Sequence, residues 1–357
     1  MLNSGTRYKI QDTRPENCSC VSGTSAIHGG RKALLLACIL YLSPCIWCTA
    51  HAVPVNEHPV LRLLIDEMAS KHGFTHKELE DWLSQVEIRE DIIEAVYRPK
   101  ENLPWHEYRK LFVNDDRARA GLKFWKTNAE AVFRAGSEYG VPPEIIVAII
   151  GIETFYGRQG GRYRVLDALV TLTLRYPERS DFFRTQLIEY LLLARELGVS
   201  PLSIKGSYAG AMGIPQFIPS SYRNYAVDFD GDRKRDLTDV EDAIGSVANF
   251  LKAHGWKHDE PIVGDVKLDG SMYAWLENNG LEPRISVQHL SRYGILPVQR
   301  IDTRLLAALV AFEGETAPIH RLGYNNFYVI TRYNRSKNYS LAVVELSERL
   351  RLLYYGE

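Results

Sequence analysis

The strongest constraint on folding in this sequence is an apolar segment that ends in a single carboxylate. Residues 145–152 contain only isoleucine, valine, alanine and glycine, and Glu153 follows them directly. A helix that is apolar on every face is stable only when it is buried, so this segment is predicted to lie in the core. The prolines at 142–143 predict its start, and Gly157 predicts its end.

Glu153 combines this burial with a position at the end of a helix. Desolvation by the isoleucines and the negative end of the helix dipole are both expected to raise its pKa. A carboxyl group that is partly protonated near neutral pH can donate a proton to a glycosidic oxygen. From the residues alone, a surface carboxylate at a helix end remains the alternative.

The rest of the chain predicts a mainly α protein with a minor β part. Apolar residues at helical spacing predict helices over 58–71, over 117–139 and after residue 340, and the capping-box pattern at 75–78 predicts another. Ser180 is predicted to cap a further helix. The predicted organisation is an export signal over 1–52, a helical domain over 53–140 that 340–357 rejoins, a core over 141–259, a small β-containing domain over 260–318, and a return to the core over 319–339.

The N-terminal segment has the pattern of an export signal. All five cysteines lie within the first 48 residues, and an apolar stretch over 33–47 follows Arg31 and Lys32. Ala50 and Ala52 supply the small residues that a signal peptidase reads. We therefore expect a soluble periplasmic protein. Lipid attachment at Cys38, with anchoring to the outer membrane, and a retained membrane helix are the alternatives.

Composition and missing motifs exclude several classes of function. The formal net charge is −1, so no global basic field predicts nucleic acid as a partner. The sequence contains no zinc-protease His-Glu-x-x-His, no nucleophile elbow, no Walker loop and no dinucleotide-binding glycine pattern. The histidines are scattered singly, which is typical of structural roles.

Four ordered segments resemble one known family. They are Ile152–Gly157 (Ile-Glu-Thr-Phe-Tyr-Gly), Tyr176–Arg184, Gly206–Tyr222 and Thr331–Asn334. Together they resemble the B-type lytic murein transglycosylases, over roughly residues 55–357. The resemblance implies a lysozyme-like core with an additional helical domain and a small β-containing domain. It also implies that Glu153 is the catalyst.

The resemblance further implies a set of substrate-binding residues beside Glu153. Small residues along 206–213 let a ligand approach the backbone closely, although a tightly packed helix pair would need them too. Hydroxyl and amide side chains can bond sugar hydroxyl and acetamido groups. The implied groove residues are Ser207, Gln216, Arg179, Tyr108, Phe250, Tyr333 and Asn334. Phe250 departs from the family pattern, which has tyrosine there, so one polar contact is lost while an aromatic face remains.

The implied reaction needs only one carboxylate. Ordinary glycosidases use two, and no second acid accompanies Glu153 within its motif. Asp167 is more consistent with a structural pair. In the family, the acid protonates the bond between N-acetylmuramic acid and N-acetylglucosamine, the acetamido group stabilises the cationic centre, and the C6 hydroxyl closes a 1,6-anhydro ring.

Two other functions stay open at this stage. A hydrolytic muramidase of lysozyme type would use the same glutamate but would add water to the product. A non-catalytic peptidoglycan-binding protein would hold the glycan strand without cleaving it. Peptidoglycan glycan strands are the implied partner in each case, and the sequence does not specify any protein of cell-wall synthesis or remodelling.

An acidic turn predicts a metal site. Asp228, Asp230 and Asp232 stand at alternate positions, and Lys234 supplies a backbone carbonyl at position 7. Oxygen ligands at this spacing can converge on a hard cation, and a flexible loop of this kind favours calcium over magnesium. A solvated acidic turn, partly paired with its own arginines, is the alternative.

The last ligand of this loop is implied by the resemblance. The family has a loop longer than the twelve-residue calcium loop, and its final, bidentate ligand corresponds to Asp242 at position 15. Asp239 at position 12 is better placed to cap a helix that begins at Val240. The calcium is expected to be structural.

Overall fold

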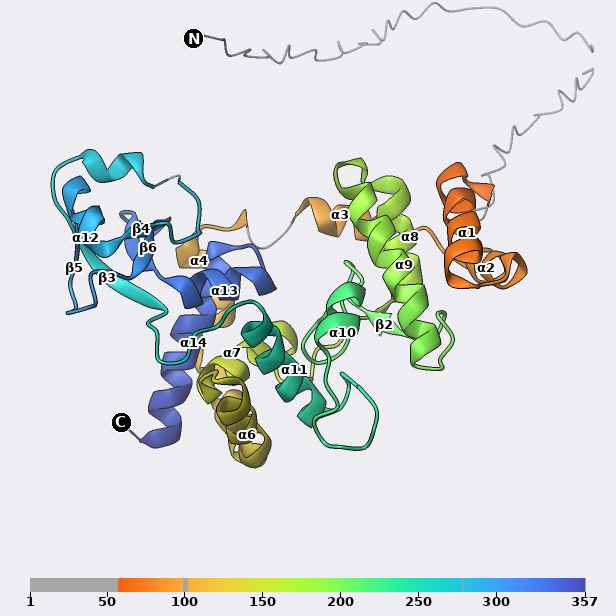
Figure 1. Cartoon of the computed structure of the whole chain (residues 1–357), viewed down its shortest axis with the longest axis horizontal. Helices are drawn as coiled ribbons and strands as arrows, with labels where there is room; N and C mark the ends of the chain where they lie inside the picture. Colours follow the sequence, from red (N-terminus) through yellow and green to blue (C-terminus); the bar gives the residue numbers. More distant parts are fainter. Residues whose placement is uncertain (1–56, 99–101, 278, 357) are drawn as a thin grey trace, which may run out of the picture. The chain divides into compact units, whose positions relative to one another are not determined.

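The computed structural model describes residues 57–98, 102–277 and 279–356 (Figure 1). The predicted export signal and all five cysteines lie outside the described residues. Within the described part, no helix is both long and apolar enough to cross a bilayer.

The described residues form mostly helices. The α-helices are α1 (Pro59–His72), α2 (His76–Leu83), α3 (Glu90–Tyr97), α4 (Trp105–Phe112), α5 (Asp115–Thr127), α6 (Ala129–Tyr139), α7 (Pro143–Thr154), α8 (Val165–Arg175), α9 (Ser180–Glu196), α10 (Pro219–Tyr225), α11 (Val240–Ala253), α12 (Val287–Leu290), α13 (Asn325–Tyr333) and α14 (Lys337–Tyr355). The strands are β1 (Tyr163–Arg164), β2 (Lys205–Gly206), β3 (Val263–Leu268), β4 (Ile285–Ser286), β5 (Ile295–Pro297), β6 (Leu306–Phe312) and β7 (Ile319–Gly323). The predicted mainly α class is confirmed.

Local interactions explain several helix boundaries, and they correct two of the predictions made from the sequence. Thr75 and Glu78 form the predicted capping box of α2. The helix predicted over 117–139 is two helices, because Asn128 leaves helical geometry and its side chain donates to the Phe124 carbonyl at 2.8 Å. Ser180 does not cap α9, since its hydroxyl donates back to the carbonyl of Thr173.

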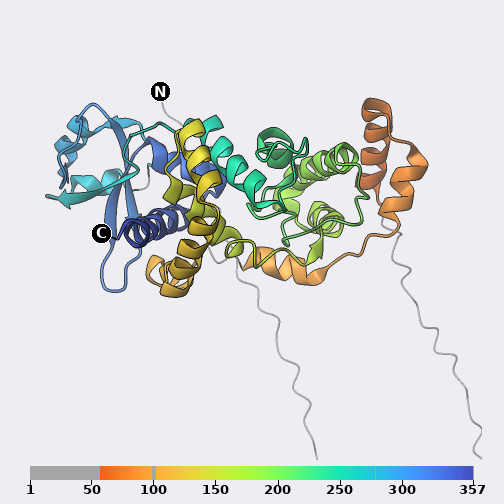
Figure 2. The same cartoon turned by 90° about the horizontal axis from the view of Figure 1, so that it is seen from below.

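The apolar helix α7 lies in the core, as its composition requires. Each residue from Ile145 to Ile152 is buried. Helices α5, α6, α11 and α14 all contact α7. Helices α6 and α11 lie side by side (Figures 1 and 2). Glu153 is therefore presented from the end of a helix that its neighbours hold in place.

The helices of the predicted 53–140 domain make their main contacts with different partners. Helices α4 and α5 contact α14, as expected for a C-terminal segment that returns to this region. Helix α3 instead packs against α8, and Glu67 of α1 pairs with Arg184 of α9. The division of the chain into domains stays a prediction.

The β-containing region forms one antiparallel sheet with the strand order β4-β6-β7-β3-β5. Strand β7 pairs with both β6 and β3, so the sheet extends to Gly323, beyond the predicted domain boundary at 318. A second core packs under this sheet and contains Leu276, Val287, Leu290, Ile295, Leu309 and Leu322.

Candidate active site

Glu153 is the second-last residue of α7 and is half-buried. The helix ends at Thr154, three residues before the predicted stop, because Phe155 (φ 50°), Tyr156 (φ 62°) and Gly157 (φ 80°) are all left-handed. This turn folds the Tyr156 ring back against Gly151, where an added Cβ would come within 2.5 Å of the phenol oxygen. The glycine in the apolar run is therefore needed for this close approach.

A tyrosine on the C-terminal helix contacts the carboxylate directly. The Tyr339 hydroxyl donates to Glu153 Oε1 at 2.7 Å, from the first turn of α14. The Tyr339 ring is 2% exposed and lies nearly parallel to the ring of Tyr333, with centroids 6.4 Å apart. Burial raises the pKa of both tyrosines well above the usual value, and the charge of Glu153 adds to this. Both phenols therefore stay protonated and can donate.

Sequence reasoning did not single out Tyr339. The signal was present, because Tyr339, Val343, Leu346 and Leu350 recur at steps of three and four and share the buried face of α14. A tyrosine on a buried face needs a partner for its hydroxyl. Only the packing of α14 against α7 shows that this partner is the Glu153 carboxylate.

Arg117 holds the end of α7 from the other side and was also missed. Its guanidinium is buried, donates to the Gly151 carbonyl, and lies between the rings of Phe112 and Phe155 at 5.3 and 4.9 Å. Burial lowers its pKa. A cation at the carboxyl end of a helix satisfies free carbonyls and offsets the negative end of the dipole.

Thr154 connects the end of α7 to the small-residue segment. Its hydroxyl donates to the Ile214 carbonyl at 2.8 Å and accepts from the Gly157 amide at 3.0 Å. In that segment, the Ser207 hydroxyl accepts from two amides of its own loop, at 3.1 and 3.2 Å. Gln216 has φ 51° and its amide donates to the Gly213 carbonyl at 2.8 Å. Both predicted groove residues thus lie on one tightly folded segment beside Glu153.

Two further predicted groove residues come from the end of α13. The Tyr333 hydroxyl donates to the Pro215 carbonyl at 2.6 Å, which joins α13 to the same segment. Asn334 is half-buried and accepts from the Ser336 amide at 3.2 Å. The structure therefore brings Ser207, Gln216, Tyr333 and Asn334 around one segment, with Glu153 and Tyr339 next to it.

Tyr108 and Phe250 are more deeply buried than the other predicted groove residues. Tyr108 is 1% exposed and packs against Phe112, and Phe250 is 4% exposed and packs against Phe217 and Tyr333. Both rings fill the apolar interior behind the site, and their direct contacts with a saccharide stay predictions.

Arg179 and Asp167 have different outcomes. Arg179 is exposed, with its guanidinium 4.2 Å from the ring centroid of Phe182, so its role toward substrate stays a prediction. Asp167 is 3% exposed and accepts from Arg164 at 2.6 Å and from the Glu87 amide at 3.2 Å. The predicted structural role of Asp167 is confirmed.

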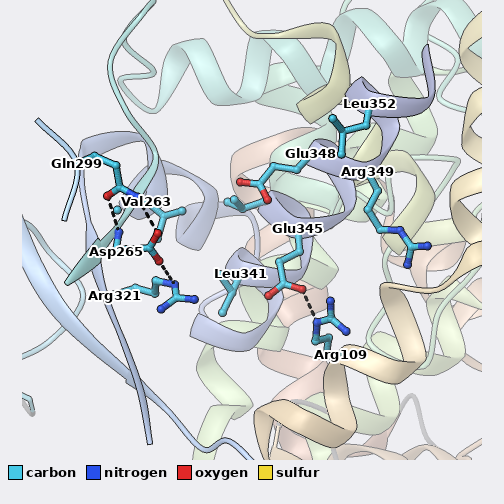
Figure 3. Close-up of a pocket in the computed structure, with 12 residues that line it drawn as sticks. Arg109, Val263, Asp265, Gln299, Arg321, Leu341, Glu345, Glu348, Arg349 and Leu352 are labelled. Atoms are coloured by element: carbon cyan, nitrogen blue, oxygen red, sulfur yellow. Dashed lines mark hydrogen bonds and ion pairs between the residues drawn. The ribbon is translucent and has the colours of Figure 1, made fainter. Parts of the chain in front are cut away.

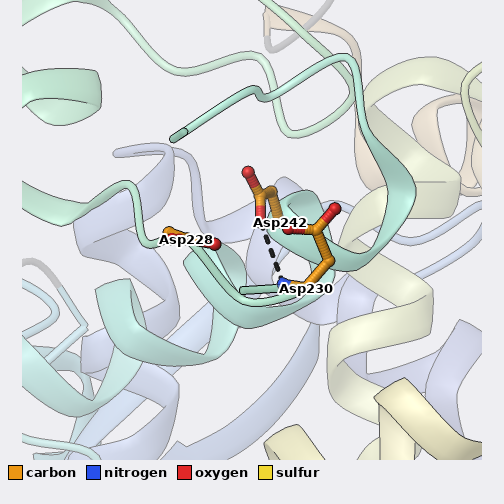
Figure 4. A group of neighbouring side chains, drawn as sticks. All are labelled: Asp228, Asp230 and Asp242. Atoms are coloured by element: carbon orange, nitrogen blue, oxygen red, sulfur yellow. Dashed lines mark hydrogen bonds between the residues drawn. The ribbon is translucent and has the colours of Figure 1, made fainter. Parts of the chain in front are cut away.

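Three of the predicted metal ligands converge. Asp228, Asp230 and Asp242 each place a carboxylate oxygen within 4.8 Å of the others (Figure 4). Asp242 is 1% exposed, and its two oxygens accept backbone amides of Phe229 and Asp236 at 2.6 and 2.7 Å. Burial raises its pKa. This oxygen-only set around a buried carboxylate fits a hard divalent cation.

Two further loop residues, Asp232 and Lys234, are predicted as ligands, and Asp239 as a helix cap. Asp232 is not part of the converging group, and its carboxylate accepts the Lys234 amide at 2.8 Å. The predicted roles of Asp232 and of the Lys234 carbonyl stay predictions. Asp239 caps α11 by accepting from the amides of Glu241 and Asp242, as predicted.

A polar cavity of about 450 Å³ lies elsewhere, between α14 and the strands β3 and β7 (Figure 3). Two ion pairs lie in its lining. Arg109 pairs with Glu345 of α14, and Arg321 of β7 pairs with Asp265 of β3. Neither Glu153 nor any of the predicted groove residues lines this cavity.

Comparison with known proteins gives the family. Residues 56–348 match the family model described as Transglycosylase SLT domain. The chain belongs to the transglycosylase SLT domain family. Membrane-bound lytic murein transglycosylase B from Escherichia coli K12 is 41% identical over 306 residues, which cover 83% of this chain and 84% of the relative.

Solved structures of lytic transglycosylases resemble this family member throughout. The catenated lytic transglycosylase SltB1 from Pseudomonas aeruginosa has a TM-score of 0.79 and 44% identity, and the match covers 84% of this chain and 99% of that one. Escherichia coli Slt35 in complex with calcium has a TM-score of 0.77 and 41% identity (84% and 95% covered). Pseudomonas aeruginosa SltB3 in complex with NAG-anhNAM-pentapeptide has a TM-score of 0.70 and 30% identity (81% and 78% covered). The predicted family and lysozyme-like core are confirmed.

Proposed function

We propose that this lytic transglycosylase cleaves the β-1,4 bond between N-acetylmuramic acid and N-acetylglucosamine in peptidoglycan without consuming water. Glu153 is its acid and then its base. The observation that carries this proposal is the half-buried Glu153 carboxylate at the end of a buried helix, held by the Tyr339 hydroxyl at 2.7 Å. Asp167 is the first acidic residue after Glu153 in the sequence. Its carboxylate accepts a hydrogen bond from Arg164, so we do not assign it as a second catalytic carboxylate.

Each step of the reaction can be assigned to groups of the chain and its substrate. Protonated Glu153 gives its proton to the glycosidic oxygen, which leaves as the hydroxyl of N-acetylglucosamine. The neighbouring acetamido group of the muramic acid stabilises the cationic carbon. Ionised Glu153 then takes the proton of the C6 hydroxyl as that oxygen attacks the same carbon. The product ends in a 1,6-anhydro ring, and Glu153 is protonated again.

Tyr339 and Arg117 support this cycle without touching the glycan. The Tyr339 hydroxyl holds Glu153 Oε1 in one position, and Arg117 fixes the helix end from which Glu153 projects. Since both side chains are buried, water competes little for their hydrogen bonds. A fixed carboxylate costs less reorganisation during proton transfer.

The glycan is proposed to lie along the 207–217 segment. The Ser207 hydroxyl still has its own proton to donate while it accepts from the loop amides, so it can bond an acetamido carbonyl. Gln216, Asn334 and Tyr333 are proposed to contact the same glycan, and Arg179 is proposed as a more distant polar contact. A complex of SltB3 with NAG-anhNAM-pentapeptide, a product-like fragment, supports this kind of substrate.

We also propose that the loop over 228–242 binds a structural calcium ion. Asp228, Asp230 and Asp242 would hold it, with Asp232 and the Lys234 carbonyl as further ligands. Bound calcium would neutralise carboxylates that otherwise repel one another. The solved structure of Slt35 in complex with calcium supports the choice of ion.

The proposed location is the periplasm, with export by the segment over 1–52. The curated relative is named as membrane-bound, so lipid attachment at Cys38 and anchoring to the outer membrane is the alternative for this chain. Mass determination of the mature N-terminus distinguishes a cleaved signal from a lipidated cysteine.

The decisive experiment is digestion of purified sacculi by the mature protein and by Glu153→Gln, followed by mass spectrometry of the muropeptides. We expect 1,6-anhydro-muramic ends from the wild type and less than about a tenth of that activity from the variant. Circular dichroism and Tm check that the variant folds. Reducing ends one water heavier would instead identify a hydrolytic muramidase, and binding without any product would identify a peptidoglycan-binding protein.

A further inference from the structure

A second pocket, of about 500 Å³, lies behind the segment that carries the predicted groove residues. We call it the basic pocket. It is lined by Glu196, Leu197, Val199, Ile204, Lys205, Met212, Gly213, Tyr222, Arg233, Lys234, Arg235, Asp236, Leu237 and Thr238. Four cationic side chains in this lining face two carboxylates, so the lining carries two positive charges in excess.

Both carboxylates of the basic pocket already have partners. Glu196 is held by the guanidinium of Arg223, with contacts at 2.8 and 3.1 Å. Asp236 accepts from the amide and hydroxyl of Thr238 at 2.8 and 2.7 Å. Among the described residues, the side chains of Lys205 and Arg233 have no hydrogen bond or ion pair, although the Arg233 backbone amide donates to Asp228 at 2.8 Å. The excess charge of the pocket is therefore available to an anion from outside.

The basic pocket borders the proposed active site through backbone contacts. Gly213 lines the pocket, and its carbonyl accepts from Gln216 at 2.8 Å. The Ile214 amide donates to the Leu237 carbonyl at 2.8 Å, while the Ile214 carbonyl accepts from Thr154, the neighbour of Glu153. The turn over 213–216 thus lies between the pocket and the catalytic motif.

The position of Lys205 also places the basic pocket close to the proposed active site. Lys205 lies on β2, two residues before Ser207. Two residues of extended chain span roughly 7 Å. A peptide attached to a sugar beside Ser207 would therefore reach the pocket with about three residues, since each extended residue covers about 3.4 Å.

We propose that the basic pocket binds the carboxylates of the stem peptide that the glycan substrate carries. This inference rests on the proposed function. Lys205 and Arg233 would pair with the carboxylates, and the accessible Leu197, Val199 and Ile204 would contact the methyl and methylene groups between them. The acidic side chains of the pocket already have partners, two of its cationic side chains do not, and part of its lining is apolar. These features match a peptide with several carboxylates better than they match a neutral sugar.

The test compares strands with and without peptides. A Lys205→Ala/Arg233→Ala double variant and the wild type would each digest intact glycan strands and strands from which an amidase has removed the peptides, at constant calcium. We expect kcat/KM on peptide-bearing strands to fall about tenfold, with the loss reduced at high salt, because exposed pairs are screened. On peptide-free strands the variant should equal the wild type.

Binding is measured separately in the Glu153→Gln background. Titration with NAG-NAM-pentapeptide and with peptide-free NAG-NAM should show a pentapeptide affinity advantage that disappears with the double variant. A Lys267→Ala/Arg300→Ala variant removes two exposed cations of the β-containing region and should keep the advantage.

The outcomes separate this inference from the proposed function. An equal effect of the double variant on both kinds of strand, or no effect on either, would overturn the peptide site while leaving the catalytic proposal intact. Binding of anionic vesicles but not of the pentapeptide would replace the peptide with a lipid and also overturn it. No cleavage of either strand by the wild type would overturn the proposed function itself.

Discussion

At the residue scale, the protein holds one carboxylate oxygen of Glu153, the proposed catalyst, through a tyrosine hydroxyl. Glu153 lies at a helix end, where its side chain could adopt several rotamers, and Tyr339 restricts it through a 2.7 Å hydrogen bond. The phenol belongs to a helix 186 residues later in the chain. Its raised pKa keeps it a donor throughout the neutral range.

Tyr339→Phe tests this restriction with the removal of a single oxygen. We expect kcat to fall about tenfold or more, since a hydrogen bond to a charged group contributes roughly 1.5–3 kcal/mol. KM should change little, because the Tyr339 ring is buried and is proposed to act only through Glu153. The measurement is kcat and KM on purified glycan strands. Tyr293→Phe, which removes a hydroxyl far from Glu153 in sequence and in a different core, serves as the matched control. Wild-type kcat in Tyr339→Phe would show that Glu153 needs no such restraint.

At the element scale, the buried helix α7 carries a carboxylate near each end. Glu153 is the proposed catalyst, whereas Glu144 in the first turn has its pKa raised by burial. Because the folded protein then binds this proton more tightly than the unfolded chain, the contribution of Glu144 to stability is present below its unfolded pKa. It is lost as pH rises through the folded pKa.

Glu144→Gln should therefore stabilise the protein at neutral pH only. We expect Tm to rise by about 2 °C at pH 7. At pH 3 Tm should stay unchanged, because protonated Glu144 is then as neutral as the glutamine that replaces it. Thermal unfolding followed by circular dichroism at the two pH values provides the measurement. Glu130→Gln, an exposed residue in the first turn of α6, makes the same charge change and should show no such gain. A gain at pH 3 would mean that packing, rather than charge, is responsible.

At the scale of the whole molecule, the acidic loop joins α10 to α11, a helix that packs against α6 and α7. Removal of calcium should therefore lower the stability of the folded chain as well as that of the loop. At calcium near 100 times its dissociation constant, chelation is expected to lower Tm by about 4 °C. Differential scanning calorimetry with and without a calcium chelator measures the shift.

Variants decide whether this effect comes from the loop. Asp230→Asn should abolish most of the calcium-dependent shift, whereas Asp269→Asn, an exposed aspartate of the β-containing region, should retain it. If the wild-type Tm does not respond to chelation, the structural calcium proposal is wrong, although the converging carboxylates would still need an explanation.

Local sequence was enough to predict several elements and to single out Glu153 as a candidate catalyst. The apolar run over 145–152 could only be a buried helix, and the capping box at 75–78 and the left-handed Gly140 define helix ends through contacts a few residues apart. The same locality explains the acidic loop, because alternate residues in a turn are neighbours whatever the rest of the chain does. Glu153 stood out because it is the polar group at the end of that buried helix.

Tertiary structure alone decided which distant residues meet Glu153 and which rings are covered. Tyr339 and Arg117 reach the end of α7 only because α14 and α5 pack against it, and no local pattern sets that contact. Tyr108 and Phe250 carry the aromatic rings expected of a sugar groove, yet the surrounding helices bury them. Burial and long-range hydrogen bonds depend on how elements pack together, whereas helix formation, capping and turn geometry depend on neighbours along the chain.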